Sequence, residues 1–413
     1  MKHYVFATYE LHPVTPGGAG VLVAGAVRSL VRAGHRVTVL ADFPPAEIEQ
    51  ARRHASLDNV GTGLLEIVSV AEQLKTPQLE GSVFRQNSER FQLALELLSQ
   101  RGPIDLVEFP EYAGMGLSSL RAHRTQNWLP DTKMAVRVHG SLEYIDRAEG
   151  VLAGLERLEM YAMEREGLRL ADVILVPSES LGALYADEYG IAQHRLVVSP
   201  PPMEDLLAGL EGRPRLPDPG HFLFFGKLQE VKGCVQLAQA AVALISADPT
   251  RHWRFTFIGR DTPCSRHEQS TLRCVTDAIP DSARPQFVFI PGIDRMDLPK
   301  FCVRPAAAVF PSRFETFCLA AHEVRALGVP LIVPAIHAFA DSFSAETGCF
   351  TYDGTTAGLQ RAIERIRTDV ELQLKLELAG RPSYPAFTAA YDRVSTSKLV
   401  RPSSLPSGAQ LAR

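Results

Sequence analysis

Short apolar runs alternate with segments of helical periodicity along most of the chain. This alternation is typical of βαβ units, which build parallel sheets covered by helices. In the first half, the apolar runs that predict strands are residues 4–8, 36–41, 64–70, 105–109, 134–139, 173–176 and 196–199. The helical periods between them predict helices over residues 19–33, 84–100, 152–170 and 180–188.

A proline- and glycine-rich segment, residues 199–220, interrupts this alternation and predicts an interdomain linker. After it the alternation restarts, with expected strands at 222–225, 255–258, 287–290, 307–310 and 331–333. The predicted fold class is therefore α/β, with two Rossmann-like domains. The expected parts are a first domain over 1–203, a second over 204–380, a helix within 381–400 that returns to the first domain, and a flexible tail over 401–413.

Composition supports a folded chain with more than one core. The 413 residues exceed the roughly 300 at which a single core stops growing. Hydrophobic residues make up 46% and charged residues 22%, which is ordinary for a globular protein and not for a disordered one. The formal net charge is −4 and no basic run is present, so we expect no nucleic-acid partner.

The cysteines and the N-terminus indicate a cytoplasmic setting. All six cysteines lie in the second half, and none has the C-x-x-C spacing of a zinc or redox site. Met1 leads directly into a strand-like run, so no signal peptide is expected. No apolar window of about 18 residues predicts a spanning helix, which leaves peripheral contact with the inner membrane face as the open membrane association. The sequence does not indicate the oligomeric state.

A glycine loop follows the first predicted strand and contains Gly17 and Gly18. Glycines let a ligand approach the backbone closely, and the helix that follows favours an anion at its N-terminus. The full spacing of a dinucleotide motif is absent, and a plain tight turn is the alternative.

A second loop carries Lys227 and Lys232 between two glycines, after the first strand of the second domain. Ligands of open α/β sheets gather outside the carboxyl ends of the strands, where this loop must lie. Two lysines there are suited to a diphosphate, whereas the alternative is a solvated turn with exposed lysines.

A third segment follows the predicted strand at 307–310 and leads into a helix predicted over 317–327. Glu315 is then expected at the helix entrance, where a carboxylate is electrostatically favoured. The amides of Thr316, Phe317 and Cys318 are expected to be free to donate to a phosphate or sugar oxygen.

Glu323 falls within an apolar stripe of the same predicted helix. A buried carboxylate needs partners, because an unpaired buried charge costs several kcal/mol. Ribose hydroxyls are suitable donors, and the alternatives are a salt bridge with Arg325 or His322 or an exposed helix edge.

Together these features resemble glycosyltransferase family 4, whose members have the GT-B fold. The resemblance covers residues 4 to about 394, and its most specific part is Glu315 and Glu323 followed by residues 326–330. It implies two Rossmann-like domains whose parallel sheets face each other across a cleft. It also implies a retaining, metal-independent hexosyl transfer from a nucleotide diphosphate sugar to a hydroxyl of a sugar-like, glycolipid or small-molecule acceptor, without a cofactor.

The resemblance also implies roles for single residues. Glu315 would contact the donor sugar, Glu323 the ribose and Lys232 the diphosphate, while His139 would lie near the reacting carbon. The implied catalytic residues are His139, Lys232 and Glu315. The implied donor-binding residues are Gly17, Gly18, Lys227, Lys232, Gly259, Glu315, Thr316, Phe317, Cys318 and Glu323.

The sequence departs from the family pattern at several positions. Lys227 stands where an arginine is usual, so the bidentate fork is lost while the charge is kept. Thr316 and Cys318 replace two glycines, and residues 335–341 replace a double-glycine and Pro-Glu segment. The nucleotide and sugar of the donor are therefore open, with a UDP-sugar favoured and a GDP-sugar as the alternative.

The acceptor is expected against the first domain, across the cleft from the donor. Aromatic and acidic residues on three predicted loops suit stacking on a sugar and hydrogen bonding to it. These residues are Tyr9, Glu111, Tyr112 and Glu143.

Two other classes of function stay open at this point. One is a catalytically silent relative that binds a nucleotide-sugar or a partner subunit. The other is a sugar-nucleotide epimerase or a phosphorylase with the same fold.

Overall fold

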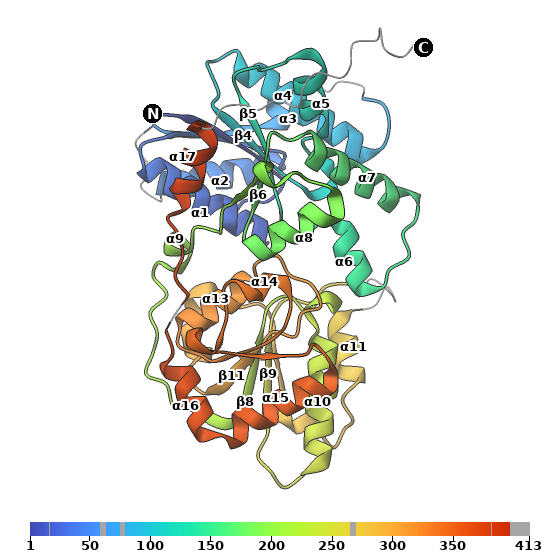
Figure 1. Cartoon of the computed structure of the whole chain (residues 1–413), viewed down its shortest axis with the longest axis vertical. Coiled ribbons are helices and arrows are strands. Elements are labelled where there is room, and N and C mark those ends of the chain that lie inside the picture. The colour runs from blue at the N-terminus through green and yellow to red at the C-terminus, as the bar shows by residue number, and fades with distance from the viewer. Residues whose placement is uncertain (16, 58–62, 75–78, 265–269, 381, 397–413) are drawn as a thin grey trace.

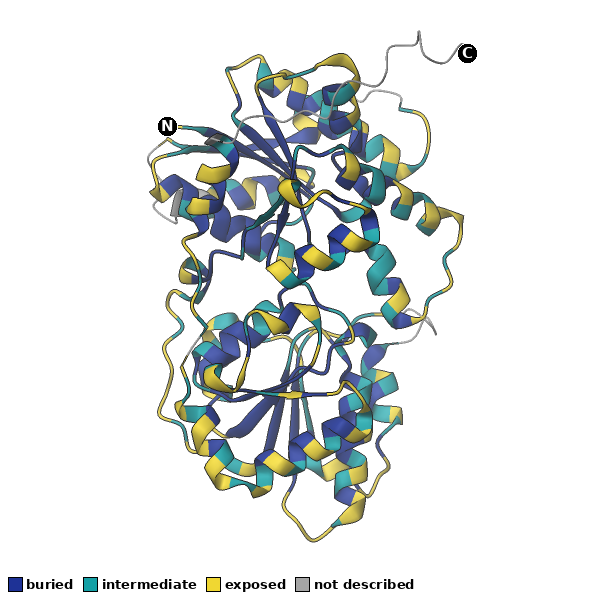
Figure 2. Ribbon diagram, in the orientation of Figure 1, coloured by how far each residue is buried: buried dark blue, intermediate teal, exposed yellow. Residues whose placement is uncertain are grey.

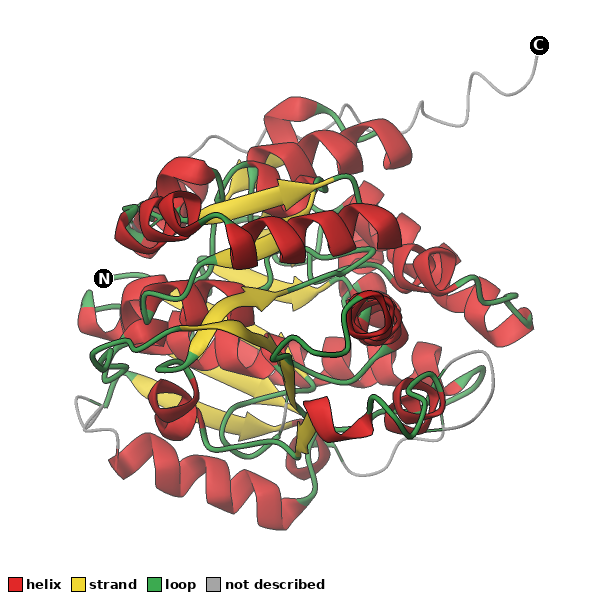
Figure 3. Ribbon diagram, turned by 90° about the horizontal axis from the view of Figure 1, so that it is seen from below, coloured by secondary structure: helices red, strands yellow, loops and turns green. Residues whose placement is uncertain are grey.

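A computed structural model describes residues 1–15, 17–57, 63–74, 79–264, 270–380 and 382–396. The chain forms two α/β domains stacked along the long axis of the molecule (Figure 1). Each domain has one wholly parallel sheet. Seen from below, the strands lie between helices (Figure 3). The predicted fold class of two Rossmann-like domains is confirmed.

The first domain contains a seven-stranded sheet of order β3-β2-β1-β4-β5-β6-β7. Its strands are β1 (His3–Thr8), β2 (Arg36–Ala41), β3 (Leu65–Ser69), β4 (Leu106–Pro110), β5 (Lys133–Arg137), β6 (Val173–Val176) and β7 (Leu196–Val198). The order reverses between β1 and β4, and such a switch point is where open α/β sheets bind ligands.

Side chains alternate between the two faces of this sheet, as the period of two requires. Tyr4 and Phe6 enter the core under one set of helices, whereas Val5 and Ala7 enter the core on the opposite face. The first face is covered by α1 (Gly18–Arg32), α2 (Pro45–Leu57) and α17 (Phe387–Thr396). The second face is covered by α4 (Val83–Ser99), α5 (Leu117–Gln126), α7 (Leu155–Leu170) and α8 (Glu179–Tyr189), with the short α3 (Val70–Gln73) beside α4.

The second domain contains a six-stranded sheet of order β10-β9-β8-β11-β12-β13. Its strands are β8 (Asp218–Phe225), β9 (Arg254–Ile258), β10 (Phe287–Ile290), β11 (Pro305–Val309), β12 (Leu331–Pro334) and β13 (Cys349–Tyr352). One face packs on α10 (Cys234–Ala247), α11 (Thr271–Asp277), α15 (Thr356–Thr368) and α16 (Val370–Leu378). The other face packs on α12 (Leu298–Phe301), α13 (Leu319–Ala326) and α14 (His337–Ala340). Figure 2 shows both sheets as buried layers between half-exposed helices.

The segment between the domains is more ordered than the sequence predicts. The expected linker at 199–220 includes α9 (Met203–Leu207) and the beginning of β8. α9 packs on α1, where a Cβ added to Gly25 would lie 2.8 Å from Pro202 and 2.9 Å from Leu206. Apolar packing therefore fixes a stretch whose prolines suggest a free linker.

The last helix of the described chain, α17, lies against the first domain (Figure 1). Its Tyr391 is buried and donates a hydrogen bond to Glu108 on β4. Arg137 on β5 completes this buried group, with Nε 2.6 Å from Glu108 Oε1 and Nη2 3.1 Å from the Tyr391 hydroxyl. The chain thus crosses from the second domain back to the core of the first.

The segment 335–341, which departs from the family pattern, belongs to the second domain and contacts the first. It forms α14, which packs near the N-terminus of α8. Asp341 accepts a hydrogen bond from the amide of Ser180 at 2.8 Å and another from its hydroxyl. Asp341 therefore caps a helix of the first domain from a loop of the second.

Two predicted helices begin later than the sequence suggests, and several helices of the first domain, such as α2 and α5, lie outside the predicted ranges. The helix expected from residue 152 begins at Leu155, and the helix expected from residue 317 begins at Leu319. Residues 141–144, expected as a loop, lead into α6 (Leu142–Glu149). Among the described residues, no helix is both long and apolar enough to cross a membrane.

Candidate functional site

Two loops of the second domain meet at the carboxyl edge of its sheet. One is the 3-10 turn η3 (Glu230–Lys232) before α10, and the other is the segment 311–318 after β11. The amide of Arg313 donates to the Val231 carbonyl at 2.8 Å. A Cβ added to Gly233 would lie 2.0 Å from the Pro311 carbonyl oxygen, so the backbones touch where only glycine fits.

This contact brings Lys232 to Glu315. The Lys232 Nζ lies 2.7 Å from Glu315 Oε1, and the Ser312 hydroxyl donates to the same oxygen at 3.0 Å. Burial lowers the pKa of Lys232, but the adjacent Glu315 more than offsets this and leaves that pKa raised. Lys232 is therefore a cation at neutral pH, paired with a carboxylate that is only 6% exposed.

The amides of Thr316, Phe317 and Cys318 donate to no acceptor within the described part of the chain. They do not belong to α13, because this helix begins at Leu319 with Cys318 as its N-cap. The expected helix N-terminus at Glu315 is therefore corrected to an irregular loop with free amides before α13. Cys318 has φ 65 and ψ 66, a left-handed conformation that costs a side chain energy.

The side chain of Phe317 does not face a ligand site. It packs with Met203 and Leu206 of the interdomain segment and stacks on the His322 ring, with centroids 4.0 Å apart. Only the backbone of Phe317 is left for the donor-binding role that the resemblance implies.

Glu323 is buried on α13, as its apolar stripe predicts. Its partner is Arg295 of the 3-10 turn η5 (Arg295–Asp297), whose Nε lies 2.6 Å from Oε1. The alternatives Arg325 and His322 are wrong, because Arg325 donates to the carbonyls of Thr347 and Ala379 and His322 bonds to Tyr384. Burial raises the pKa of Glu323, and Arg295 opposes this shift.

Lys227 and Gly259 lie at the ends of neighbouring strands. A Cβ added to Gly259 would lie 1.7 Å from the Gly226 carbonyl oxygen, so β8 and β9 approach closely there. Lys227 is exposed and pairs with no acid among the described residues. Arg260, which sequence reasoning missed, is exposed beside it, and the amide of Leu228 donates to its carbonyl at 2.8 Å. Its position two residues after the end of β9 was the signal that could have identified Arg260.

In the first domain, Gly17 is the N-cap of α1 and Gly18 its first residue. A Cβ added to Gly17 would lie 1.9 Å from Glu10 Oε2, and that oxygen accepts from the amide of Gly20 at 3.2 Å. The helix N-terminus predicted to favour a ligand anion therefore already holds an internal carboxylate. Sequence reasoning missed Glu10, which follows the end of β1.

His139 lies just beyond β5, opposite the loop of Glu315. A Cβ added to Gly140 would lie 3.3 Å from both Phe314 and Thr316, so the two segments meet across the domain boundary. Burial, aided by Arg137, lowers the pKa of His139 to about 3, and the imidazole is neutral at pH 7. His139 also borders a cavity of about 10 Å³, roughly the space of one water molecule.

Glu111 binds the backbone of the segment that carries His139 through hydrogen bonds. Its Oε2 accepts from the amides of His139 and Gly140 at 2.8 and 3.0 Å, and its Oε1 accepts from the Tyr185 hydroxyl at 2.9 Å. The carboxylate is 1% exposed, and burial raises its pKa to about 7. Glu111 was expected to face an acceptor, but the structure places it inside the domain.

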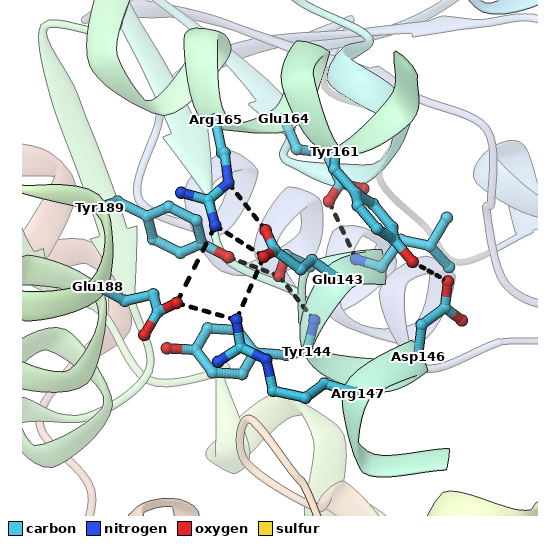
Figure 4. Close-up of polar contacts among 11 residues, drawn as sticks. Glu143, Tyr144, Asp146, Arg147, Tyr161, Glu164, Arg165, Glu188 and Tyr189 are labelled. Carbon is cyan, nitrogen blue, oxygen red and sulfur yellow. Dashed lines mark hydrogen bonds and ion pairs between the residues drawn. The ribbon is translucent and has the colours of Figure 1, made fainter. Parts of the chain in front are cut away.

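Glu143 is also engaged within the protein (Figure 4). It lies on α6, where Arg165 donates to it at 2.7 and 2.8 Å and Arg147 at 3.2 Å. The expectation of an acceptor-binding loop at this position is thus corrected to an ion-paired helix. Tyr9 and Tyr112 do come together, with ring centroids 5.1 Å apart, and both are half-buried.

Comparison with known proteins covers both domains. The family model described as Glycosyltransferase Family 4 matches residues 16–205, and the model described as Glycosyl transferases group 1 matches residues 219–369. Glycogen synthase of Mycobacterium tuberculosis is 23% identical over 382 residues, which cover 88% of this chain and 86% of that protein.

Solved structures show the same two-domain fold. Sucrose-phosphate synthase from Thermosynechococcus elongatus superimposes with a TM-score of 0.68 at 17% identity over 96% of each chain. HepE from Anabaena, solved with UDP and glucose, gives a TM-score of 0.60 at 12% identity over 95% of this chain and 96% of that one. The resemblance seen in the sequence is confirmed: the chain belongs to glycosyltransferase family 4 and has the GT-B fold.

Proposed function

We propose that this protein is a retaining hexosyltransferase that moves a sugar from a nucleotide diphosphate sugar to a hydroxyl of a sugar-like acceptor. The observation that carries the proposal is the Lys232–Glu315 pair, which lies beside free backbone amides and opposite His139. A cation and free donors at the carboxyl edge of a parallel sheet suit a diphosphate.

Lys232 and the free amides would stabilise the departing diphosphate. Lys227 and Arg260 are exposed at the ends of β8 and β9 and add two positive charges at the same edge. Positive charge fixed before the reaction stabilises charge that develops in the transition state. We therefore propose that transfer needs no metal ion.

Glu315 would accept hydrogen bonds from hydroxyls of the donor sugar. Its Oε1 already accepts from Lys232 and Ser312, so its position is set before a donor binds. Glu323 would accept from the ribose hydroxyls, which requires the ribose to share or replace Arg295.

In the proposed reaction, the bond from the anomeric carbon to the diphosphate oxygen breaks through an oxocarbenium-like transition state. The acceptor oxygen bonds to the same face of that carbon, and its proton passes to an oxygen of the leaving phosphate. His139 is neutral, so it would orient donor or acceptor by hydrogen bonding without supplying charge. Positioning and electrostatics supply most of the acceleration.

The acceptor would lie against the first domain. Tyr9 and Tyr112 form a half-buried aromatic pair close to Glu10, which suits a neutral sugar ring with hydroxyl groups. This proposal replaces the acceptor roles first expected for Glu111 and Glu143.

We favour a UDP-sugar as donor. The solved structure of HepE contains UDP and glucose, and its chain shares this fold along almost its whole length. A GDP-sugar is the second candidate. We also propose a cytoplasmic location, in keeping with free cysteines throughout the second domain.

The experiment is transfer by purified protein from a panel of UDP-, GDP-, ADP- and dTDP-sugars to simple sugar acceptors. Nuclear magnetic resonance would report the anomeric configuration of each product, and EDTA would test the metal independence. We expect a product with the donor's configuration, formed equally well in EDTA. An inverted product, a sugar-nucleotide product formed without acceptor, or no turnover with any donor would contradict the proposal.

A further inference from the structure

The helix α6 is held firmly on the first domain by charged side chains (Figure 4). Glu143 pairs with Arg165 and with Arg147, and Arg147 also donates to Glu188 on α8 at 3.0 Å. On the next turn, Asp146 bonds to the side chains of Arg157 and Tyr161 of α7. Two separate ion-pair groups thus fix α6 to α7 and α8.

The same helix reaches the second domain with its last turn. Glu149 Oε1 accepts from the amide of Val231 and from the side chain of Gln229, both at 3.2 Å. The Ala148 carbonyl accepts from Arg313 at 3.1 Å. Glu149 is 1% exposed although it joins two domains, so these contacts are shielded from water.

A ring contact adds to this junction. Tyr144 of α6 stacks on Phe314 with centroids 5.1 Å apart and an interplanar angle of 6°. Phe314 and Arg313 belong to the loop that carries Glu315, whereas Val231 immediately precedes Lys232. α6 therefore contacts both loops that bring the Lys232–Glu315 pair together.

We propose that Glu149 is a positioning residue, which sets Lys232 for the donor diphosphate by binding the Val231 amide from the opposite domain. This inference rests on the donor role proposed for Lys232. Glu149 binds the Val231 amide and the Gln229 side chain, and it would act on Lys232 through the backbone of this loop.

The path of the chain explains why Glu149 can affect the position of Lys232 relative to His139. Residues 139–149 run from His139 through α6 to Glu149, so one short, mostly helical segment connects His139 to the carboxylate that binds the loop of Lys232. Charge-assisted hydrogen bonds in a shielded place are stronger than neutral ones. A displacement of about 1 Å in a site can cost on the order of a hundredfold in rate.

The test compares Glu149→Ala and Glu149→Gln with the full-length wild-type chain. Glu156→Ala is the matched control, because Glu156 is an exposed carboxylate on the first turn of α7. Steady-state kinetics would give KM for donor and acceptor separately, and calorimetry would give the dissociation constant of UDP. Hydrogen exchange of residues 229–233 and thermal melting would report whether the loop and the fold are intact.

We expect Glu149→Ala to raise the donor KM and the UDP dissociation constant about tenfold or more, with faster exchange in residues 229–233 and an unchanged acceptor KM. Glu149→Gln keeps an acceptor for the Val231 amide, so it should recover most of the donor affinity. This variant keeps the test valid if the alanine variant folds poorly. Faster loop exchange with wild-type UDP affinity and kcat/KM would overturn the positioning role. A wild-type protein that neither binds UDP nor transfers sugar would overturn the proposed function itself, and the positioning role with it.

Discussion

Arg295 Nε lies 2.6 Å from Glu323 Oε1, so the carboxylate proposed for the ribose already has a cationic partner. Glu323 is buried, whereas Arg295 remains about a quarter exposed. A ribose that binds Glu323 must therefore compete with Arg295 or share the carboxylate with it.

The variant Arg295→Ala tests whether Arg295 and a ribose compete for Glu323. The variant leaves Glu323 buried without its cation, and we expect a loss of about 1–2 kcal/mol in the free energy of unfolding, discounted for solvent at Arg295. Ribose hydroxyls can then satisfy Glu323, so UDP should raise the melting temperature more in the variant than in the wild type. Equal ligand shifts in the two proteins, measured by thermal denaturation, would argue against a ribose at Glu323.

Glu111 should make stability depend on pH. Burial raises its folded pKa to about 7 from an ordinary value of 4.5. The stabilisation tied to its protonated form is complete below about pH 4.5 and is lost as the pH rises through about 7. Urea denaturation from pH 5 to 8 should show a decline in the wild type that is smaller in Glu111→Gln, by up to about 3 kcal/mol. Parallel curves for the two proteins would contradict this assignment.

Glu10 should oppose an anionic ligand at α1. Its carboxylate accepts from the Gly20 amide at the helix N-terminus, where a negative charge contributes about 0.3–1 kcal/mol. Glu10→Gln should therefore lower the unfolding free energy by that amount. The same variant should lower the dissociation constant for a donor whose phosphates approach Gly17 and Gly18. Calorimetry with UDP gives the test, and weaker UDP binding in Glu10→Gln would place Glu10 among the groups that hold the ligand.

The left-handed backbone conformation of Cys318 should lower the free energy of unfolding, and a glycine at this position should remove that loss. Its φ of 65 is left-handed, a region that glycine enters freely and alanine does not. We expect Cys318→Gly to be more stable than Cys318→Ala by about 1 kcal/mol, because the comparison isolates the backbone conformation. Guanidinium denaturation of both variants provides the measurement, and an alanine variant as stable as the glycine variant would refute the strain.

Much of the fold and part of the site could be predicted from the sequence. The apolar runs at 222–225 and 307–310 fall on strands whose residues 222–224 and 307–309 are buried on both faces, so their pattern is strong. Lys232 and Glu315 follow β8 and β11, which are neighbours in the sheet, and the general rule for strand ends places them at one edge.

The remaining features depend on contacts that a single sequence does not encode locally. α6 is short, and charged residues, not an apolar stripe, fix much of it, so no helical period indicated Glu143 as an ion-paired residue. The Arg295–Glu323 pair joins the 3-10 turn η5 to the helix α13, and Glu10 meets Gly17 only because β1 and α1 pack together. Tertiary contacts decide each of these positions.

The central claim is that Glu315, held by Lys232, acts on the donor sugar. The most direct measurement is kcat/KM for transfer by Glu315→Ala, with Glu346→Ala as an exposed carboxylate control and melting temperatures to confirm folding. The expected result is a loss of about a hundredfold or more in Glu315→Ala, with little change in UDP affinity, because in the proposed complex Glu315 contacts the sugar and Lys232 the phosphates. Turnover at the wild-type rate in a folded Glu315→Ala variant would contradict the claim.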